Sequence, residues 1–332
     1  MLWNNVELFN VEYIEEGESG TRVYRFPKET LPAFDLPWLE YSKWASALTT
    51  GCEMRFVGEG ADIELCGVSE AGTVEIFRGD YLDRVVAVPK GEPVKIELRR
   101  GCQLDKCDMK TIEFAFSSDV WRVVFDHDFA VQIVSFSPIG EIRPPREDEV
   151  PRKKIICYGS SITHSAGALN YTNSYIYTVG RIIGADMLCK GMGGSCLIQG
   201  EVADYIERAD WDGAILELGV NMVGHGLDVS VFRERAEYLI KCAVKREKPI
   251  FLISIFSCYH DFTYSVENKL NEEYIACLEE LYEKYKSDKV FYIRGRDIVT
   301  DYRYLLSDLL HPSPFGHGEM GRKIAEFIKG KI

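Results

Sequence analysis

Alternating hydrophobic and polar residues run along the first part of the chain. From about residue 20 to about residue 140, the alternation is clearest in residues 61–66 and 93–98. A period of two is typical of a strand with one buried face. Further short strands are predicted at residues 73–77, 84–88, 111–116, 120–125 and 130–137. Because turn residues separate these strands and no helix-length periodic segment interrupts them, we expect an antiparallel, jelly-roll-like β-sandwich over residues 1–145.

The pattern changes after a charged, proline-rich stretch that we interpret as a linker over residues 146–152. From there to the C-terminus, short apolar runs alternate with segments whose apolar residues recur at helical spacing. The predicted strands are residues 154–158, 185–189, 214–218, 250–256 and 290–293, and the predicted helices lie near 175–183, 232–243, 274–285 and 320–328. Repeated βα units form a parallel sheet that helices cover on both faces, so residues 153–332 are expected to be an α/β domain.

Composition and charge exclude several classes of protein. The 332 residues carry a net charge of −13, which argues against nucleic acid and anionic membrane surfaces as main partners. The N-terminus does not resemble a signal peptide, and the apolar runs are too short to cross a bilayer. The ten cysteines include no Cys-x-x-Cys pair, which fits reduced thiols in a cytoplasmic protein. Cys102 and Cys107 lack further ligands at metal-binding spacing, so no metal or other cofactor is expected.

The strongest candidate for chemistry is a serine that follows the first strand of the predicted α/β domain. Residues 154–158 form the strand, and Gly159, Ser160 and Ser161 follow it directly. In an open parallel sheet, ligands bind at the carboxyl ends of the strands. We therefore predict that Ser161 is a nucleophile. The alternative is a loop serine that caps the following helix.

A nucleophilic serine needs a general base, and one histidine near the C-terminus has the right neighbour. Asp308 and His311 form the only Asp-x-x-His in the chain. An aspartate three residues upstream can reach the histidine ring, hold its tautomer and stabilise its protonated form. The alternative is a helix-capping pair ahead of Pro312.

Acyl transfer also needs hydrogen-bond donors for the developing oxyanion. Three sources follow the strands of the α/β domain: the backbone N–H of Ser161, the glycine-rich residues 190–195, and the side-chain amide of Asn221. Glycine lacks a Cβ, so its N–H is open to a ligand. The alternative for the glycines and for Asn221 is an ordinary turn.

These four blocks, in this order on a βα pattern, resemble the SGNH (GDSL-type) hydrolase family. The resemblance covers about residues 153–330 and implies a three-layer α/β/α, flavodoxin-like domain that hydrolyses esters through an acyl-enzyme. By resemblance, Ser161 is the nucleophile and Gly194 and Asn221 join it in the oxyanion hole. Asp308 and His311 match the family's final Asp-x-x-His.

The chain departs from the family pattern in two places. Ser160 stands where the family often has an aspartate, and Cys189 stands where an asparagine often opens the glycine-rich block. The register of that block leaves Gly191 and Gly193 as alternatives to Gly194. Both departures change local hydrogen bonding around the predicted oxyanion hole.

The resemblance and the preceding sandwich lead to one function and two rivals. We expect a serine esterase that hydrolyses short, acetyl-type esters on a small acylated sugar, because some carbohydrate acetyl esterases carry such a sandwich. The rivals are an acyltransferase that uses the same acyl-enzyme and an inactive carbohydrate-binding protein. The sequence does not predict an oligomeric state.

The remaining candidates are a cluster of aromatic residues and three histidines near the predicted site. Trp38, Tyr41 and Trp44 form an aromatic cluster that belongs either to a core or to a sugar contact. His164 and His225 are expected in solvated loops at the rim of the site. His317 is expected to cap the last helix.

Overall fold

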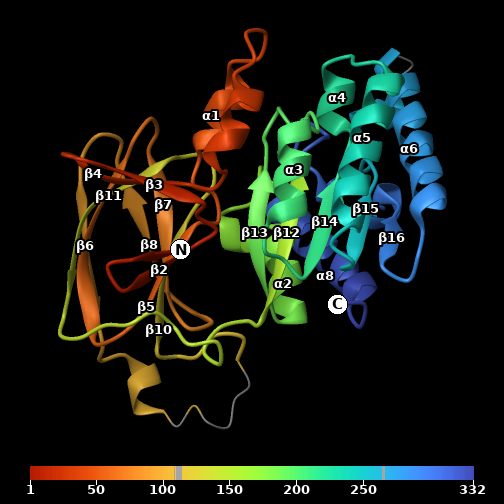
Figure 1. Ribbon diagram of the computed structural model, residues 1–332. Coiled ribbons are helices and arrows are strands. Elements are labelled where there is room, and N and C mark those ends of the chain that lie inside the picture. Colours follow the sequence, from red (N-terminus) through yellow and green to blue (C-terminus); the bar gives the residue numbers. More distant parts are fainter. Residues whose placement is uncertain (108, 110–113, 264–265) are drawn as a thin grey trace. The chain divides into compact units, whose positions relative to one another are not determined.

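The computed structural model describes residues 1–107, 109, 114–263 and 266–332, and the chain forms two compact units (Figure 1). The first unit contains residues 1–27 and 47–152, and the second contains residues 28–46 and 153–332. The sequence pattern assigned residues 28–46 to the first domain, but these residues pack in the second unit. They contain a 3-10 helix, η1 (Lys28–Phe34), and a short α-helix, α1 (Tyr41–Ala47), so the expectation of a helix-free first segment was wrong.

The first unit consists of two antiparallel sheets, which confirms the predicted sandwich. One sheet has the order β1 (Leu2–Trp3), β2 (Val6–Phe9), β5 (Glu53–Val57), β10 (Val120–Phe125), β7 (Gly72–Arg78) and β8 (Tyr81–Val88). The other has the order β3 (Tyr13–Gly17), β4 (Gly20–Tyr24), β11 (Val131–Pro138), β6 (Gly60–Gly67) and β9 (Val94–Arg99). A 3-10 turn, η2 (Gln103–Lys106), follows β9.

The strand predicted at residues 111–116 is absent from residues 114–116, the part of it that the structure describes. Residues 111–113 lie outside the described residues, and residues 114–116 are not in a strand. The five strands β1–β5 lie outside the strands predicted from the sequence. Several of them are short, and in β5 four of the five residues are buried, so alternation is weak there.

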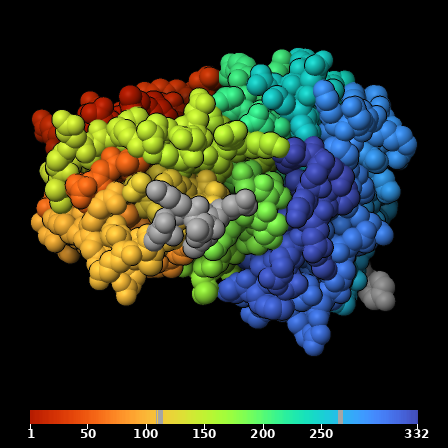
Figure 2. All heavy atoms as spheres, turned by 90° about the horizontal axis from the view of Figure 1, so that it is seen from below, coloured from red at the N-terminus to blue at the C-terminus, as the bar shows by residue number. Residues whose placement is uncertain are grey.

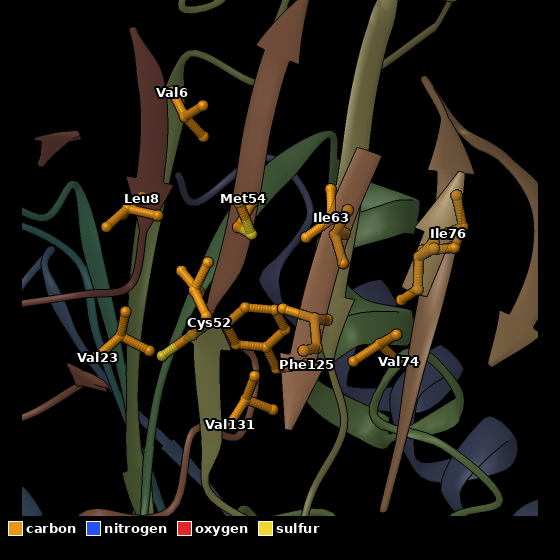
Figure 3. Packing of buried hydrophobic residues seen from close by; sticks show 14 of the residues in the cluster. Val6, Leu8, Val23, Cys52, Met54, Ile63, Val74, Ile76, Phe125 and Val131 are labelled. Atoms are coloured by element: carbon orange, nitrogen blue, oxygen red, sulfur yellow. The ribbon is translucent and has the colours of Figure 1, made fainter. Parts of the chain in front are cut away.

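The core of the first unit is formed by inward-facing apolar side chains from both sheets (Figure 3). Val6 and Leu8 on β2, Met54 on β5 and Ile63 on β6 are fully buried there. Their spacing of two residues along each strand puts one side chain out of two into the core. The alternation seen in the sequence therefore reports the buried face of this sandwich.

The second unit is built on one parallel sheet. Its order is β13 (Ala185–Gly191), β12 (Lys153–Gly159), β14 (Gly213–Glu217), β15 (Ile250–Ile253) and β16 (Val290–Ile293). In order of appearance within this unit, the strands are arranged 2-1-3-4-5, which is the flavodoxin-like arrangement. All five predicted strands of the α/β domain are present, and the expected fold class is confirmed.

Helices cover both faces of this sheet, α2 with α8 on one face and α3, α5 and α6 on the other (Figure 1). Their bounds are α2 (Tyr175–Ile183), α3 (Gly200–Arg208), α4 (Val220–Gly224), α5 (Val229–Val244), α6 (Val266–Tyr285), α7 (Gly295–Ile298) and α8 (Pro314–Ile328). Short 3-10 turns are η4 (Tyr171–Asn173), η5 (Tyr259–Phe262) and η6 (Tyr302–Tyr304). Figure 2 shows the dark blue C-terminal segment with α8 against the green segment with α2. Within the described residues, every helix is too short or too polar to span a bilayer.

A buried ionic cluster lies on β5 and β10 of the first unit. The Glu53 carboxylate accepts hydrogen bonds from Arg122 at 2.8 and 2.9 Å and from Arg55 at 2.8 Å. All three side chains are at most 3% exposed. The Arg122 guanidinium also lies 3.7 Å from the ring centroid of Phe116. Two cations are tolerated in this interior because they share the Glu53 carboxylate, Glu7 lies 3.9 Å from Arg55, and aromatic faces complete their surroundings.

We expect Glu53→Gln to destabilise the first unit by roughly 3–5 kcal/mol at pH 7, because Arg55 and Arg122 would lose the buried carboxylate that they share. Burial alone would raise the pKa of Glu53, but the two arginines outweigh burial and lower it from 4.5 to about 2. A lowered pKa contributes stability that is complete above pH 4.5 and is lost as the pH falls towards 2. The deficit of the variant should therefore shrink over this range.

Urea unfolding of the full chain at several pH values measures this deficit. Glu97→Gln is the matched control, because the Glu97 side chain is 55% exposed and pairs with Lys95 on the surface of β9. The control should unfold like the wild type, since exposed ion pairs contribute little. A Glu53→Gln deficit that stays constant from neutral to acid pH would contradict the assignment.

Candidate active site

The loop after β12 presents Ser161 at the carboxyl edge of the sheet. Gly159 ends the strand, and a Cβ there would collide with the Thr163 hydroxyl and with the carboxylate of Glu217. The loop can therefore turn tightly against β14 only with glycine at this position. The backbone N–H and the hydroxyl of Ser160 each donate to Glu217 Oε2 at 2.7 Å. Ser161, the next residue, is half-buried.

Ser161 is hydrogen-bonded to the predicted base. Its Oγ lies 2.8 Å from His311 Nε2, and His311 Nδ1 lies 2.7 Å from Asp308 Oδ2. With Nδ1 donating its proton to the carboxylate, Nε2 is an acceptor for the Ser161 hydroxyl. The three side chains thus form one hydrogen-bonded line, although 147 residues separate Ser161 from Asp308 in the sequence.

The turn that carries Asp308 and His311 is held by its own backbone. Asp308 Oδ1 accepts from the N–H groups of Leu310 and His311 at 2.9 and 3.0 Å. A bridge between Leu305 and Pro312 closes the turn at its base. One carboxylate oxygen of Asp308 therefore stabilises the turn, and the other binds the imidazole of His311.

The electrostatics keep Asp308 ionised. Partial burial would raise its pKa, but the hydrogen bond from His311 and the two backbone N–H groups outweigh burial and lower it. An ionised carboxylate next to Nδ1 favours the imidazole tautomer in which Nε2 can accept a proton. The helix-capping interpretation does not fit, because Ser313 is the N-cap of α8 and accepts from Gly316 N–H.

The glycine-rich block folds into a turn beside this line. Gly191 ends β13 in register with Gly159, and the N–H of Gly193 donates to His164 Nδ1 at 3.3 Å. Gly194 adopts φ of +63°, a conformation that favours glycine. Among the described residues, no acceptor is found for the Gly194 N–H or for the Ser161 N–H. Of the three glycines considered from the sequence, Gly194 therefore has the most suitable donor.

Asn221 is oriented by the same block. Its Oδ1 accepts a hydrogen bond from the N–H of Cys196 at 3.1 Å. This contact fixes the orientation of the amide and leaves Nδ2 as its donor. Asn221 lies in the first turn of α4, directly after the sheet edge. Gly219 precedes it with φ of +119°. The amide is thus available as a third donor beside the two backbone N–H groups.

Glu217 is a residue of this site that the sequence analysis did not single out. It ends β14, is 1% exposed, and accepts from Ser160 and, at 3.1 Å, from the hydroxyl of Thr163. Burial raises its pKa, although the hydrogen bonds from Ser160 act in the opposite direction. Its Oε1 is buried, and no described residue donates to it. A carboxylate at the carboxyl end of an otherwise apolar strand is the signal that could have identified it.

Three histidines near the site have structural partners. His164 is 2% exposed, so the expectation of a solvated loop histidine was wrong; its ring accepts the Gly193 N–H because the loop folds back on the glycine block. His225 is exposed, and its Nε2 donates to the Gly194 carbonyl at 2.8 Å. His317 is not the cap of α8: it is buried, accepts from Tyr175 N–H at 3.2 Å and donates to the Ala166 carbonyl at 3.0 Å.

This arrangement provides the groups that acyl transfer requires. A hydroxyl is hydrogen-bonded to an imidazole, the imidazole is hydrogen-bonded to a carboxylate, and the three N–H groups predicted as oxyanion donors follow neighbouring strands of the same sheet. Among the described residues, no group of three or more His, Cys, Asp or Glu side chains could hold a metal ion. Cys102 and Cys107 are exposed free thiols in the first unit.

Comparisons with known proteins agree with this fold. A salicylyl-acyltransferase, SsfX3, from a tetracycline biosynthetic pathway is similar over 99% of this chain and 96% of its own, with a TM-score of 0.81 and 15% identity. A family two carbohydrate esterase from Clostridium thermocellum is similar over 85% of this chain and 93% of its own (TM-score 0.62, 15% identity). An acetyl xylan esterase, Est2A, from Butyrivibrio proteoclasticus is similar over 85% and 89% (TM-score 0.53, 14% identity).

At these identities the structural similarities establish the fold alone. No match was found among curated proteins. The GDSL-like lipase/acylhydrolase family model, in contrast, matches residues 152–329, which is more than half of the chain and includes every residue of the predicted site. This protein therefore belongs to the GDSL-like lipase/acylhydrolase family.

Proposed function

We propose that this protein is a serine esterase that removes a short acyl group, acetyl above all, from a sugar. The observation that carries the proposal is the hydrogen-bonded line from Ser161 through His311 to Asp308, with distances of 2.8 and 2.7 Å. Family membership and esterase and acyltransferase structural neighbours support ester chemistry at this line. The sugar and the acetyl group are the finer part of the proposal.

In the first half-reaction, His311 Nε2 takes the proton of Ser161 as Oγ attacks the carbonyl carbon of the ester. The oxyanion that forms accepts from the N–H groups of Ser161 and Gly194 and from Asn221 Nδ2. Asp308 stabilises the protonated imidazole through Nδ1. His311 then gives its proton to the alcohol oxygen, the alcohol leaves, and the acyl group remains on Ser161.

In the second half-reaction, water takes the place of the alcohol. His311 removes a proton from this water as its oxygen attacks the acyl carbon, and the same three donors hold the second oxyanion. When this intermediate collapses, the carboxylic acid leaves and the proton returns to the Ser161 oxygen. The residues named so far perform every proton transfer in this sequence.

The sugar part of the proposal draws on what two structural neighbours are called. One is a family two carbohydrate esterase and another an acetyl xylan esterase, and both share this fold over most of the chain.

A second candidate is acyl transfer to an alcohol in place of water. It is favoured by the similarity to a salicylyl-acyltransferase over nearly the whole of both chains. The first half-reaction is the same in both candidates, so only the acceptor differs. Whether water or an alcohol accepts the acyl group therefore distinguishes hydrolysis from transfer.

We expect Ser161→Ala to lower the turnover of p-nitrophenyl acetate by at least about 10⁴-fold, because the acyl-enzyme cannot form. Stopped-flow or steady-state release of p-nitrophenol measures this loss. Ser160→Ala is the comparison variant one residue away; it keeps the backbone hydrogen bond to Glu217 and loses no contact with His311, so it should be affected far less than Ser161→Ala. Equal turnover in the wild type and Ser161→Ala would mean that another serine is the nucleophile.

The same assay with an octanoyl ester tests the acyl group. The wild type should process acetyl esters faster than octanoyl esters. A preference for the longer chain would contradict the acetyl part of the proposal and leave the role of Ser161 intact.

Product analysis separates hydrolysis from transfer. With acetylated sugar as donor and an excess of a second sugar as acceptor, we expect free acetic acid as the main product, detected by chromatography. The control replaces the wild type with Ser161→Ala, which should form neither product. Acetylated acceptor as the main product would establish the transferase candidate.

Glu217 is expected to position the nucleophile loop. Because Glu217 holds both the N–H and the hydroxyl of Ser160, its loss should displace the Ser161 N–H and Oγ. We expect Glu217→Leu to lower kcat about 100-fold with little change in KM, since small misplacements of reacting groups are costly. Glu217→Gln keeps an acceptor oxygen and should restore most of kcat. A folded Glu217→Leu variant with full kcat, or a Gln variant as slow as Leu, would contradict this role.

A further inference from the structure

The segment of residues 28–46 belongs to the catalytic unit although it interrupts the chain of the first unit. Its 3-10 helix η1 packs against α3, and Glu29 forms an ion pair with Arg208 of α3 at 3.0 Å. Thr30 and Phe34, both in η1, have fully buried side chains. The segment is therefore anchored on the α/β domain, and its position relative to that domain is determined by these contacts.

Two aromatic side chains of this segment remain exposed. Trp38 is 58% exposed and Tyr41 is 46% exposed, so they are not the core cluster that was one of the two expectations. Trp44 packs against Tyr41 with ring centroids 4.7 Å apart. Large aromatic rings that stay in solvent on an anchored segment are typical of a ligand-binding surface.

Both rings lie beside the proposed oxyanion block. A Cβ added to Gly194 would be 3.4 Å from two ring carbons of Tyr41, so the phenol ring covers this glycine in ordinary contact. Trp38 packs edge-to-face on His225, at 5.5 Å and 84°, and His225 donates to the Gly194 carbonyl. Tyr41 therefore contacts Gly194 directly, and Trp38 is connected to it through His225.

The same geometry places Tyr41 near the nucleophile. A Cβ on Gly193 would lie 3.7 Å from the Tyr41 hydroxyl and 3.9 Å from Ser161 Cβ. The Tyr41 hydroxyl and Ser161 Cβ therefore both lie within 4 Å of one point, which places the phenol close to the side chain of the proposed nucleophile. A substrate whose ester reaches Ser161 would meet the phenol and the indole with its alcohol part.

The chemistry of this surface suits a pyranose ring. One face of a pyranose presents C–H groups that pack on an aromatic ring, and its hydroxyls lie at the edge. The Tyr41 hydroxyl supplies a polar group at the edge of its own exposed ring. A long acyl chain would require an apolar channel without such groups.

We propose that Trp38 and Tyr41 form the subsite that holds the pyranose ring of the alcohol part of the substrate. This inference rests on the proposed function, because it names the substrate class of the same site. It assigns a role in specificity to a segment that lies outside the residues matched by the family model. Neither residue takes part in proton transfer, so their loss should act on binding of ring-bearing substrates.

The kinetic test compares three acetyl esters: an acetylated methyl glucopyranoside, the monoacetate of ethylene glycol, and phenyl acetate. We expect Trp38→Ala and Tyr41→Ala to lower kcat/KM about tenfold for the sugar ester, mainly through KM. The open-chain ester has no ring to pack on these side chains and should lose much less. Trp38→Phe and Tyr41→Phe keep a ring and should restore most of the loss.

Tyr238→Ala is the matched control. Tyr238 is 45% exposed, close to the 46% of Tyr41, but lies on α5 and donates to Asp204. It should leave all three esters unaffected. An equal loss on the sugar and open-chain esters, or no loss on either, would overturn the proposal. A loss confined to phenyl acetate would overturn the sugar assignment.

A binding measurement separates this inference from the proposed function. Calorimetry with the acetylated methyl glucopyranoside uses Ser161→Ala, which cannot turn it over, and the double variant Ser161→Ala/Trp38→Ala. We expect the double variant to bind about tenfold more weakly. If the wild type hydrolyses no ester but this difference is found, the subsite stands and the esterase proposal fails. Equal binding by the two variants would overturn the subsite.

Discussion

The register of the parallel sheet is the constraint on which the candidate site depends. β12 lies between β13 and β14, with Gly159 opposite Gly191 and Tyr158 opposite Leu216. Three strands therefore end at nearly the same level, and the loops that follow them meet. Parallel strands connected by helices carry their carboxyl ends to one edge, so a shift of any strand along its neighbour would separate the proposed nucleophile from the proposed oxyanion donors.

Buried hydrogen bonds fix the positions of these loops relative to one another. Glu217, at the end of β14, holds Ser160, and His164 holds Gly193. His317 connects the start of α2 to the loop after Ser161. Each contact joins two segments that are remote in sequence and lies where water has little access. In such surroundings a hydrogen bond is strong and a lost partner is costly, which keeps the reacting groups in place.

Ser160 shows how the departure from the family pattern is accommodated. The family often carries an aspartate at this position, whereas here the carboxylate is on β14 and the serine hydroxyl reaches it at 2.7 Å. The acceptor for the loop N–H is therefore supplied by the neighbouring strand. The segment of residues 28–46 likewise brings an aromatic side chain from early in the chain to the glycine block, where we propose a role in specificity.

The sequence by itself determined the periodicity of the elements, and with it the two fold classes. Alternation in residues 61–66 and the βα pattern after residue 152 are local consequences of which faces are buried. The order of the four blocks was enough to select Ser161, Asn221 and His311 as candidates. Tertiary structure alone decided that Glu217 supports the nucleophile loop, that His164 is buried, and that Trp38 and Tyr41 belong beside Gly194. The physical reason is that hydrogen bonds and ring contacts between distant segments depend on packing in three dimensions, which leaves no periodic trace along the chain.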